Sequence, residues 1–187
     1  MREGSTMTQQ QQPGAGSIVV GVDGSSAAFE ALLWAYRHAA RTGDELHLIT
    51  TYETEAPNTP YSPSYAFAPD GGTGARLHEA EERWRDEQHH IAQERAERLL
   101  HDVLAAVRSA VDDELEQAGV EPPHVTEEVV AGIRPSQLLI ERSHEAGLLV
   151  VGSRGLGGFR GLLLGSVSQQ CVHHAACPVV VVRHETQ

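Results

Sequence analysis

Five short apolar runs recur along the chain, each with the length and β-branched content typical of a buried strand. They predict strands within 17–26 and over 45–52, 124–132, 148–152 and 178–183. Taken together, these runs are apolar on both faces. We therefore expect strands that are covered from both sides.

Stretches with helical periodicity separate the strands. Residues 26–41 carry an i, i+3, i+4, i+7 apolar stripe that begins at Phe29, and Gly43 provides a C-terminal stop. Residues 78–118 lack proline, and their apolar residues from Trp84 to Leu115 recur at helical spacing, which predicts one long amphipathic helix. Shorter helices are predicted over 135–146, where a proline opens the first turn, and over about 166–175.

The alternation of strands and helices predicts an α/β fold with a parallel sheet and helices on both faces. We expect one domain over 17–184, preceded by a polar, disordered leader over 1–16 and interrupted by a long Pro/Gly/Tyr loop over 53–77. In such sheets, ligands bind outside the carboxyl ends of the strands, where the strand order reverses. Asp23 and Gly152 both follow predicted strands at such ends.

Composition narrows the chemistry. All 14 basic residues are arginine, which excludes a phosphate-loop lysine and Schiff-base catalysis. Residues 78–121 hold 13 acidic and 5 basic residues, and this acidic body argues against nucleic-acid binding. No run is long enough to predict a membrane span. Two cysteines are too few for a disulfide framework, so we expect a cytoplasmic protein.

The segment GSRGLGGFRGLLLGS (152–166) follows the fourth predicted strand and leads into a helix. Bare backbone beside a helix N-terminus presents N–H donors, and the helix dipole adds a positive end, so the segment favours phosphate. Its spacing matches neither GxGxxG nor GxxxxGK[ST], and an empty strand-to-helix crossover is the plain alternative.

At this spacing, Gly152, Gly155, Gly165 and Ser166 resemble the G-2x-G-9x-G-[S/T] nucleotide motif of the universal stress protein family. The opening IVVGVDGSS, the segment GIRPSQLLIERSHEAGLLVVGSRG and the closing CPVVVVR resemble the same family. The resemblance covers about residues 17–184. It implies a doubly wound five-stranded sheet of order 3-2-1-4-5 with ATP, accompanied by Mg²⁺, between strands one and four.

The resemblance also implies a role for particular residues. Asp23 would lie on the ribose and phosphate side, and Thr51 would meet adenine through its backbone. The remaining implied residues line the phosphates and ribose (Gly152, Gly155, Gly165, Ser166, Val167), flank the base (Gly21, Val22) or precede the loop (Val151). Asp23 and Ser166 also have the chemistry of helix-capping or turn residues, with or without a ligand.

Other residues carry weaker hypotheses. Arg154 and Arg160 could reach phosphate oxygens, but solvated loop arginines are commoner. Tyr61, Tyr65 and Phe67 could stack over a base, although a mobile insertion without function is the plainer interpretation. In CVHHAAC (171–177) the cysteines and histidines fall on different sides of the predicted helix, so we expect buried thiols rather than a zinc site.

Three functions remain open at this point. The first is an ATP-binding regulator of the stress response, which senses a nucleotide and is not an enzyme. The second is a slow ATPase or self-phosphorylating enzyme, and the third is a nucleotide-free interaction module. The resemblance places the strand 178–183 at a sheet edge, which favours a homodimer through that strand.

Overall fold

The computed structural model describes residues 16–53, 72–157 and 163–184. Residues 1–15 of the predicted leader and residues 54–71 of the predicted 53–77 loop lie outside these ranges. The strands are β1 (Ser17–Gly21), β2 (Glu45–Tyr52), β3 (Val125–Ala131), β4 (Leu148–Gly152) and β5 (Val179–Val182). The helices are α1 (Ser26–Thr42), α2 (Gly72–Ala118), α3 (Pro135–Arg142) and α4 (Ser166–His174).

The five strands form one parallel sheet of order β3-β2-β1-β4-β5. This order confirms the α/β, doubly wound arrangement. The strand order reverses between β1 and β4, because the chain runs outward to β2 and β3 before it crosses to β4. A crevice at the carboxyl ends of β1 and β4 is therefore the expected ligand position.

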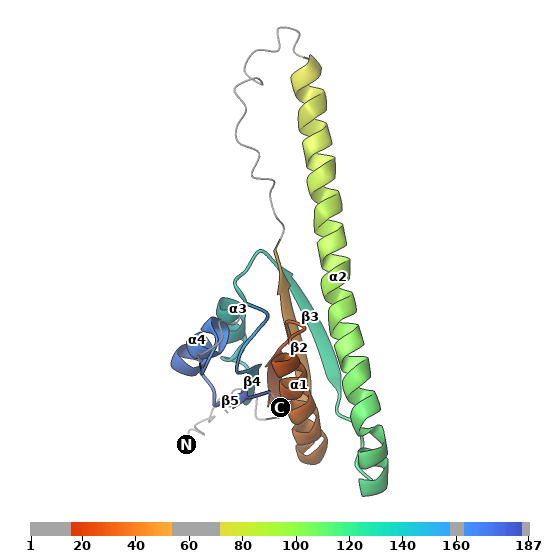
Figure 1. Cartoon of the computed structure of the whole chain (residues 1–187), viewed down its shortest axis with the longest axis vertical. Helices are drawn as coiled ribbons and strands as arrows, with labels where there is room; N and C mark the ends of the chain where they lie inside the picture. Colours follow the sequence, from red (N-terminus) through yellow and green to blue (C-terminus); the bar gives the residue numbers. More distant parts are fainter. Residues whose placement is uncertain (1–15, 54–71, 158–162, 185–187) are drawn as a thin grey trace, which may run out of the picture.

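Helices cover the two faces of the sheet (Figure 1). Side chains of successive strand residues point to opposite faces, and in β1 Ile18 and Val20 pack with α1 and α2. Val19 joins the other cluster, which includes Leu138 of α3 and Cys171 of α4. Burial on both faces is confirmed for β1 and β4 but is wrong for β3, whose Thr126 and Glu127 are exposed because β3 is an edge strand.

α1 begins and ends as its sequence predicts. The Ser25 hydroxyl accepts a hydrogen bond from the Ala28 amide (3.2 Å), and Gly43 adopts the left-handed conformation (φ 77°). Leu32 and Tyr36 of the predicted stripe are fully buried. Arg37 and Arg41 both contact Glu114 and so connect α1 to α2.

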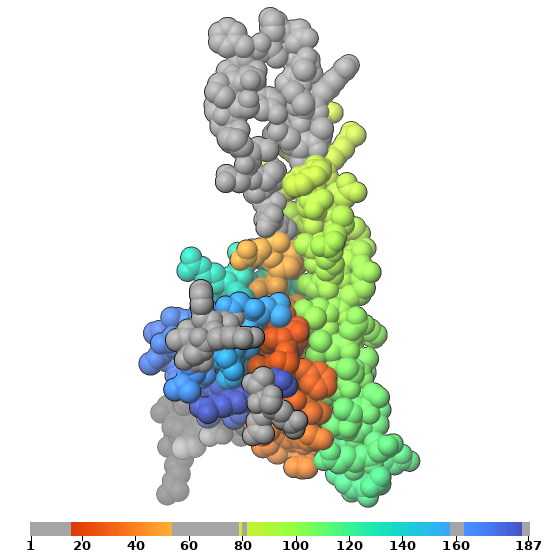
Figure 2. Space-filling view, viewed as in Figure 1, coloured from red at the N-terminus to blue at the C-terminus, as the bar shows by residue number. Residues whose placement is uncertain are grey.

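α2 is longer than predicted, because it begins at Gly72 rather than at 78. No proline occurs between Pro69 and Pro122, and the glycines at 72 and 74 weaken helix propensity without preventing a helix. At 47 residues, the helix is about 70 Å long. Among the side chains of α2 whose burial is described, the first buried one is Ala96, and the first half of the helix extends beyond the sheet (Figures 1 and 2).

α3 is shorter than predicted, because it ends at Arg142 and not at 146. The Ser143 hydroxyl donates to the Ile140 carbonyl oxygen (2.6 Å) and accepts the Ala176 amide (2.8 Å). The next amides bond three residues back, as in a 3₁₀ turn. These contacts tighten the chain and end the helix before β4.

Candidate functional site

A pocket of about 580 Å³ lies at the carboxyl ends of β1, β2 and β4. The first turns of α1 and α4, the start of α3 and one side of α2 complete its walls. This is the position that the strand order predicts. All ten residues that the sequence proposed line this one pocket: Gly21, Val22, Asp23, Thr51, Val151, Gly152, Gly155, Gly165, Ser166 and Val167.

Asp23 follows β1 and connects two loops. Its Oδ1 accepts the Ser25 amide (2.9 Å), and its Oδ2 accepts the Leu156 amide (3.2 Å). The first contact shapes the turn before α1, and the second holds the glycine-rich segment against that turn. The turn role weighed for Asp23 is therefore present, and the carboxylate also lies at the pocket wall.

The glycine-rich segment retains unpaired amides at the pocket. The Ser153 amide donates to Val182 and the Gly165 amide to Ser153, both at 2.7 Å. Within the described ranges, the loop amides of Arg154, Gly155 and Gly157 have no hydrogen-bond acceptor. The Ser166 and Val167 amides belong to the first turn of α4, where intrahelical acceptors are missing.

Close packing, rather than unusual backbone conformation, explains Gly152 and Gly155. None of the lining glycines has a positive φ. A Cβ on Gly152 would lie 2.7 Å from the Ala27 carbonyl carbon, and one on Gly155 would lie 2.3 Å from Asp23 Oδ2. The absence of a side chain at these two positions admits the first turn of α1 at Gly152 and the Asp23 carboxylate at Gly155.

The start of α4 is fixed by a residue that the sequence reasoning missed. The N-cap is Gly165, so Ser166 is the first helical residue and not the cap. The buried Ser168 hydroxyl lies 2.9 Å from the Ser153 carbonyl oxygen and 3.0 Å from that of Gly165. Ser168 thereby ties the loop to the helix and leaves the exposed Ser166 hydroxyl free to meet a ligand. In the sequence, the only signal for Ser168 was its place in SVS (166–168), which closes the glycine-rich motif.

Apolar side chains form another part of the wall. Ile49 of β2, Leu139 of α3 and Leu99 of α2 line the pocket together with Val22. Leu99 also packs on Gly24, whose Cβ would lie 3.0 Å from Leu99 Cδ1. The contribution of α2 could not be read from the sequence, because Leu99 lies far along the chain from every motif.

Among the described lining residues, two carry a charge, Asp23 and Arg154. Arg154 is half-buried, and in the described part of the chain no carboxylate lies within ion-pair distance of its guanidinium. Arg160 and the aromatic residues Tyr61, Tyr65 and Phe67 lie outside the described residues.

The cysteine and histidine cluster is not a continuous helical face. α4 ends at His174, close to the predicted end at 175, so Cys177 lies beyond the helix and shares no helical face with Cys171. Cys171 is fully buried, and burial raises the pKa of its thiol to about 11. Within the described ranges, no three His, Cys, Asp or Glu side chains are placed to hold a metal ion.

No described helix has the length and apolar character needed to cross a bilayer.

Comparisons with known proteins by sequence and by structure point to the same family. A universal stress protein of Mycobacterium tuberculosis (strain H37Rv) is 35% identical over 171 residues, which cover 90% of this chain and 48% of that protein. The chain thus spans about half the length of the curated relatives it matches. UspA from Lactobacillus plantarum shares the fold, with a TM-score of 0.56 and 22% identity, covering 92% of this chain and all of that one.

A universal stress protein from Archaeoglobus fulgidus, solved in complex with dAMP, also shares the fold. Its TM-score is 0.50 at 18% identity, and the match covers 89% of this chain and 96% of that one. The model of the universal stress protein family matches residues 15–183 of this chain. With the sheet order, the glycine-rich segment and this match in agreement, the chain belongs to the universal stress protein family.

Proposed function

We propose that this chain binds an adenine nucleotide, foremost ATP, in the pocket at the carboxyl edge of the sheet, and acts as a nucleotide-sensing regulator in stress responses. The convergence of the ten residues on one pocket carries the proposal. They come from four separate segments of the chain, and nothing but the fold brings them together. The dAMP complex of the Archaeoglobus fulgidus relative supports the class of ligand.

The two chemistries of the pocket suit the two ends of a nucleotide. Unpaired amides of the glycine-rich segment and of the first turn of α4 would bind phosphate oxygens, helped by the positive end of the α4 dipole. The apolar surface formed by Val22, Ile49 and Leu139 would accept the base. Mg²⁺ would be held mainly by the phosphates and water, with Asp23 as the nearby carboxylate.

We also propose that the protein binds nucleotide without rapid turnover. Both oxygens of Asp23 accept backbone amides, so this carboxylate is held in a structural position. Phosphoryl transfer needs charged groups that are aimed at the transferred group and at its nucleophile. Sustained phosphate release at a rate that follows protein concentration would contradict this part of the proposal.

Titration calorimetry with Mg-ATP tests the proposed site. The wild type should bind saturably at one site per chain, and Gly155→Val should weaken binding at least tenfold, because its Cβ would collide with Asp23 Oδ2 at 2.3 Å. Gly157→Ala is the matched control, since a Cβ at that position meets nothing within 4 Å. Absence of wild-type binding, or unchanged binding after Gly155→Val, would reject the proposal.

A second copy of the chain is the proposed partner. β5 lies at the edge of the sheet and pairs with β4 alone among the described strands, so one row of its backbone groups is open. Such an edge invites another strand, and pairing about a two-fold axis would satisfy both copies.

A further inference from the structure

The two charged side chains at the pocket differ in their contacts, because one accepts two hydrogen bonds and the other has no ion-pair partner among the described residues. Asp23 is fixed, because its two oxygens accept the Ser25 and Leu156 amides. Its Oδ2 also lies against Gly155, where a Cβ would be 2.3 Å away. The other charged lining residue is Arg154, one residue before Gly155. The described chain offers its guanidinium no carboxylate partner within ion-pair distance.

A bound phosphate chain would meet the Asp23 carboxylate at close range. The unpaired amides of Arg154 and Gly155 immediately precede the Leu156 amide that Asp23 occupies. Phosphates on these amides therefore add negative charge beside a negative side chain. In a partly buried pocket this repulsion is weakly screened, so it grows with each added phosphate unless a cation is present.

Arg154 is placed to supply that cation. Its main chain is held at one point, because its carbonyl oxygen accepts a hydrogen bond from the Ser25 hydroxyl at 3.4 Å. The chain contains no lysine, and Arg134 and Arg183 are exposed and do not line the pocket. Guanidinium binds phosphate oxygens through a planar pair of donors.

On the basis of the proposed nucleotide site, we infer that Arg154 binds the distal phosphates and makes the pocket prefer triphosphate over monophosphate. Its charge offsets the fixed Asp23 carboxylate, and the gain increases with the number of phosphates. A monophosphate would rely mainly on the base surface and the backbone amides.

Calorimetric affinities for ATP and AMP, measured without Mg²⁺ at one ionic strength, test the inference. Arg154→Gln should weaken ATP binding about ten- to hundredfold, which is the range for loss of a charge-assisted hydrogen bond. The same change should weaken AMP binding less than threefold, so that the ATP-to-AMP affinity ratio falls. Arg154→Lys should restore part of that ratio, because the charge returns without the paired donors.

Arg108→Gln is the matched control, since Arg108 is exposed on α2 and lies outside the pocket. It should leave both affinities and the melting temperature unchanged. The inference would be overturned if Arg154→Gln weakened ATP and AMP binding equally, or weakened neither. Either result would leave the proposed function of the wild type as a nucleotide-binding protein untouched. So would a fall of the ratio in Arg160→Gln instead of Arg154→Gln. A wild type that binds neither nucleotide would overturn the proposed function as well.

Discussion

Single glycines set the geometry of the pocket, because the missing side chain lets a neighbouring element pack closely against the main chain. Gly152 lies against the first turn of α1, where an added Cβ would be 2.7 Å from the Ala27 carbonyl carbon and 2.9 Å from the Ala28 nitrogen. Both neighbours are backbone atoms, which cannot rotate away. β4 and α1 are therefore held at a spacing that only glycine permits.

Gly152→Ala should lower the free energy of unfolding by about 1–3 kcal/mol, because a methyl group is forced into a filled space. Gly157→Ala belongs to the same loop but adds its methyl group where nothing lies within 4 Å. It should change stability by less than about 0.5 kcal/mol. Urea titrations of both variants measure the difference, and equal stabilities would show that α1 shifts freely against β4.

The sequence predicted the site residues better than it predicted their individual roles. Asp23, Gly155 and Ser166 line the pocket as expected, because strand ends and glycine spacing are local properties. It could not show that Asp23 accepts the Leu156 amide, or that Gly165 rather than Ser166 caps α4. Those contacts depend on how β1 and α4 come together in the folded chain.

At the scale of elements, an ion pair holds α3 against the edge strand β3. Arg142 Nε donates to Glu128 Oε2 at 3.0 Å, and a second nitrogen contacts the other oxygen. The hydrogen bond to Arg142 lowers the pKa of Glu128 below its ordinary value. The side chains are 38% and 37% exposed, so solvent screening limits the pair to about 0.5–1 kcal/mol.

The pH dependence of this pair follows from the lowered pKa of Glu128. Its contribution is present above the unfolded-state pKa, near 4.3, and is lost as pH falls through the lower folded-state value. Glu128→Gln should therefore cost about 0.5–1 kcal/mol at pH 7, and the difference from wild type should shrink as pH falls below the unfolded-state value. Urea titrations at pH 7 and at a series of lower pH values measure this. Glu127→Gln is the control, because Glu127 has no ion pair within the described ranges; an equal cost there would contradict the assignment.

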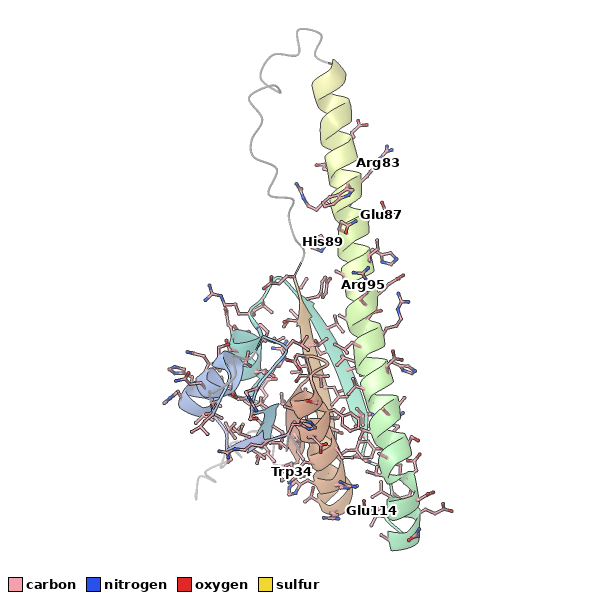
Figure 3. The ribbon with its side chains drawn as sticks, in the orientation of Figure 1. Trp34, Arg83, Glu87, His89, Arg95 and Glu114 are labelled. Atoms are coloured by element: carbon pink, nitrogen blue, oxygen red, sulfur yellow. The ribbon has the colours of Figure 1, made fainter. Side chains whose placement is uncertain are left out.

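The four predicted helices form in the expected order, but α2 is longer and α3 is shorter than predicted. The apolar spacing from Trp84 to Leu115 predicted one buried face, yet Trp84 is 43% exposed and burial begins at Ala96. Periodicity reports which residues share a face, and it does not report whether anything packs against that face. In Figure 3, Arg83 and Glu87 lie on the part of α2 that extends beyond the sheet.

At the scale of the whole molecule, two apolar clusters on opposite faces of the sheet meet at β1 and β4. The strand alternation predicted these two layers. The resemblance, rather than the apolar pattern, supplied the strand order, because alternation alone allows several doubly wound orders. β5 is left at one edge with four half-buried valines.

The open edge of β5 predicts a homodimer. Light scattering at micromolar concentration should return twice the 20.2 kDa mass of the chain, because pairing would satisfy the free row of backbone groups. Val181→Pro removes an amide donor from the open edge of β5, because the backbone groups of Pro178 and Val182 face β4, and it should therefore weaken the dimer. A single-chain mass for the wild type at this concentration would contradict the prediction.

The first half of α2 bears on how that mass must be measured. A helix that protrudes from a rounded body increases the frictional coefficient of the particle far more than it increases the particle's mass. A calibrated gel-filtration column reports hydrodynamic radius, so even a lone chain would elute early and imitate a larger assembly. At a known protein concentration, the scattered intensity of a particle of this size depends on its molecular mass and not on its shape, so it separates an elongated single chain from a true pair.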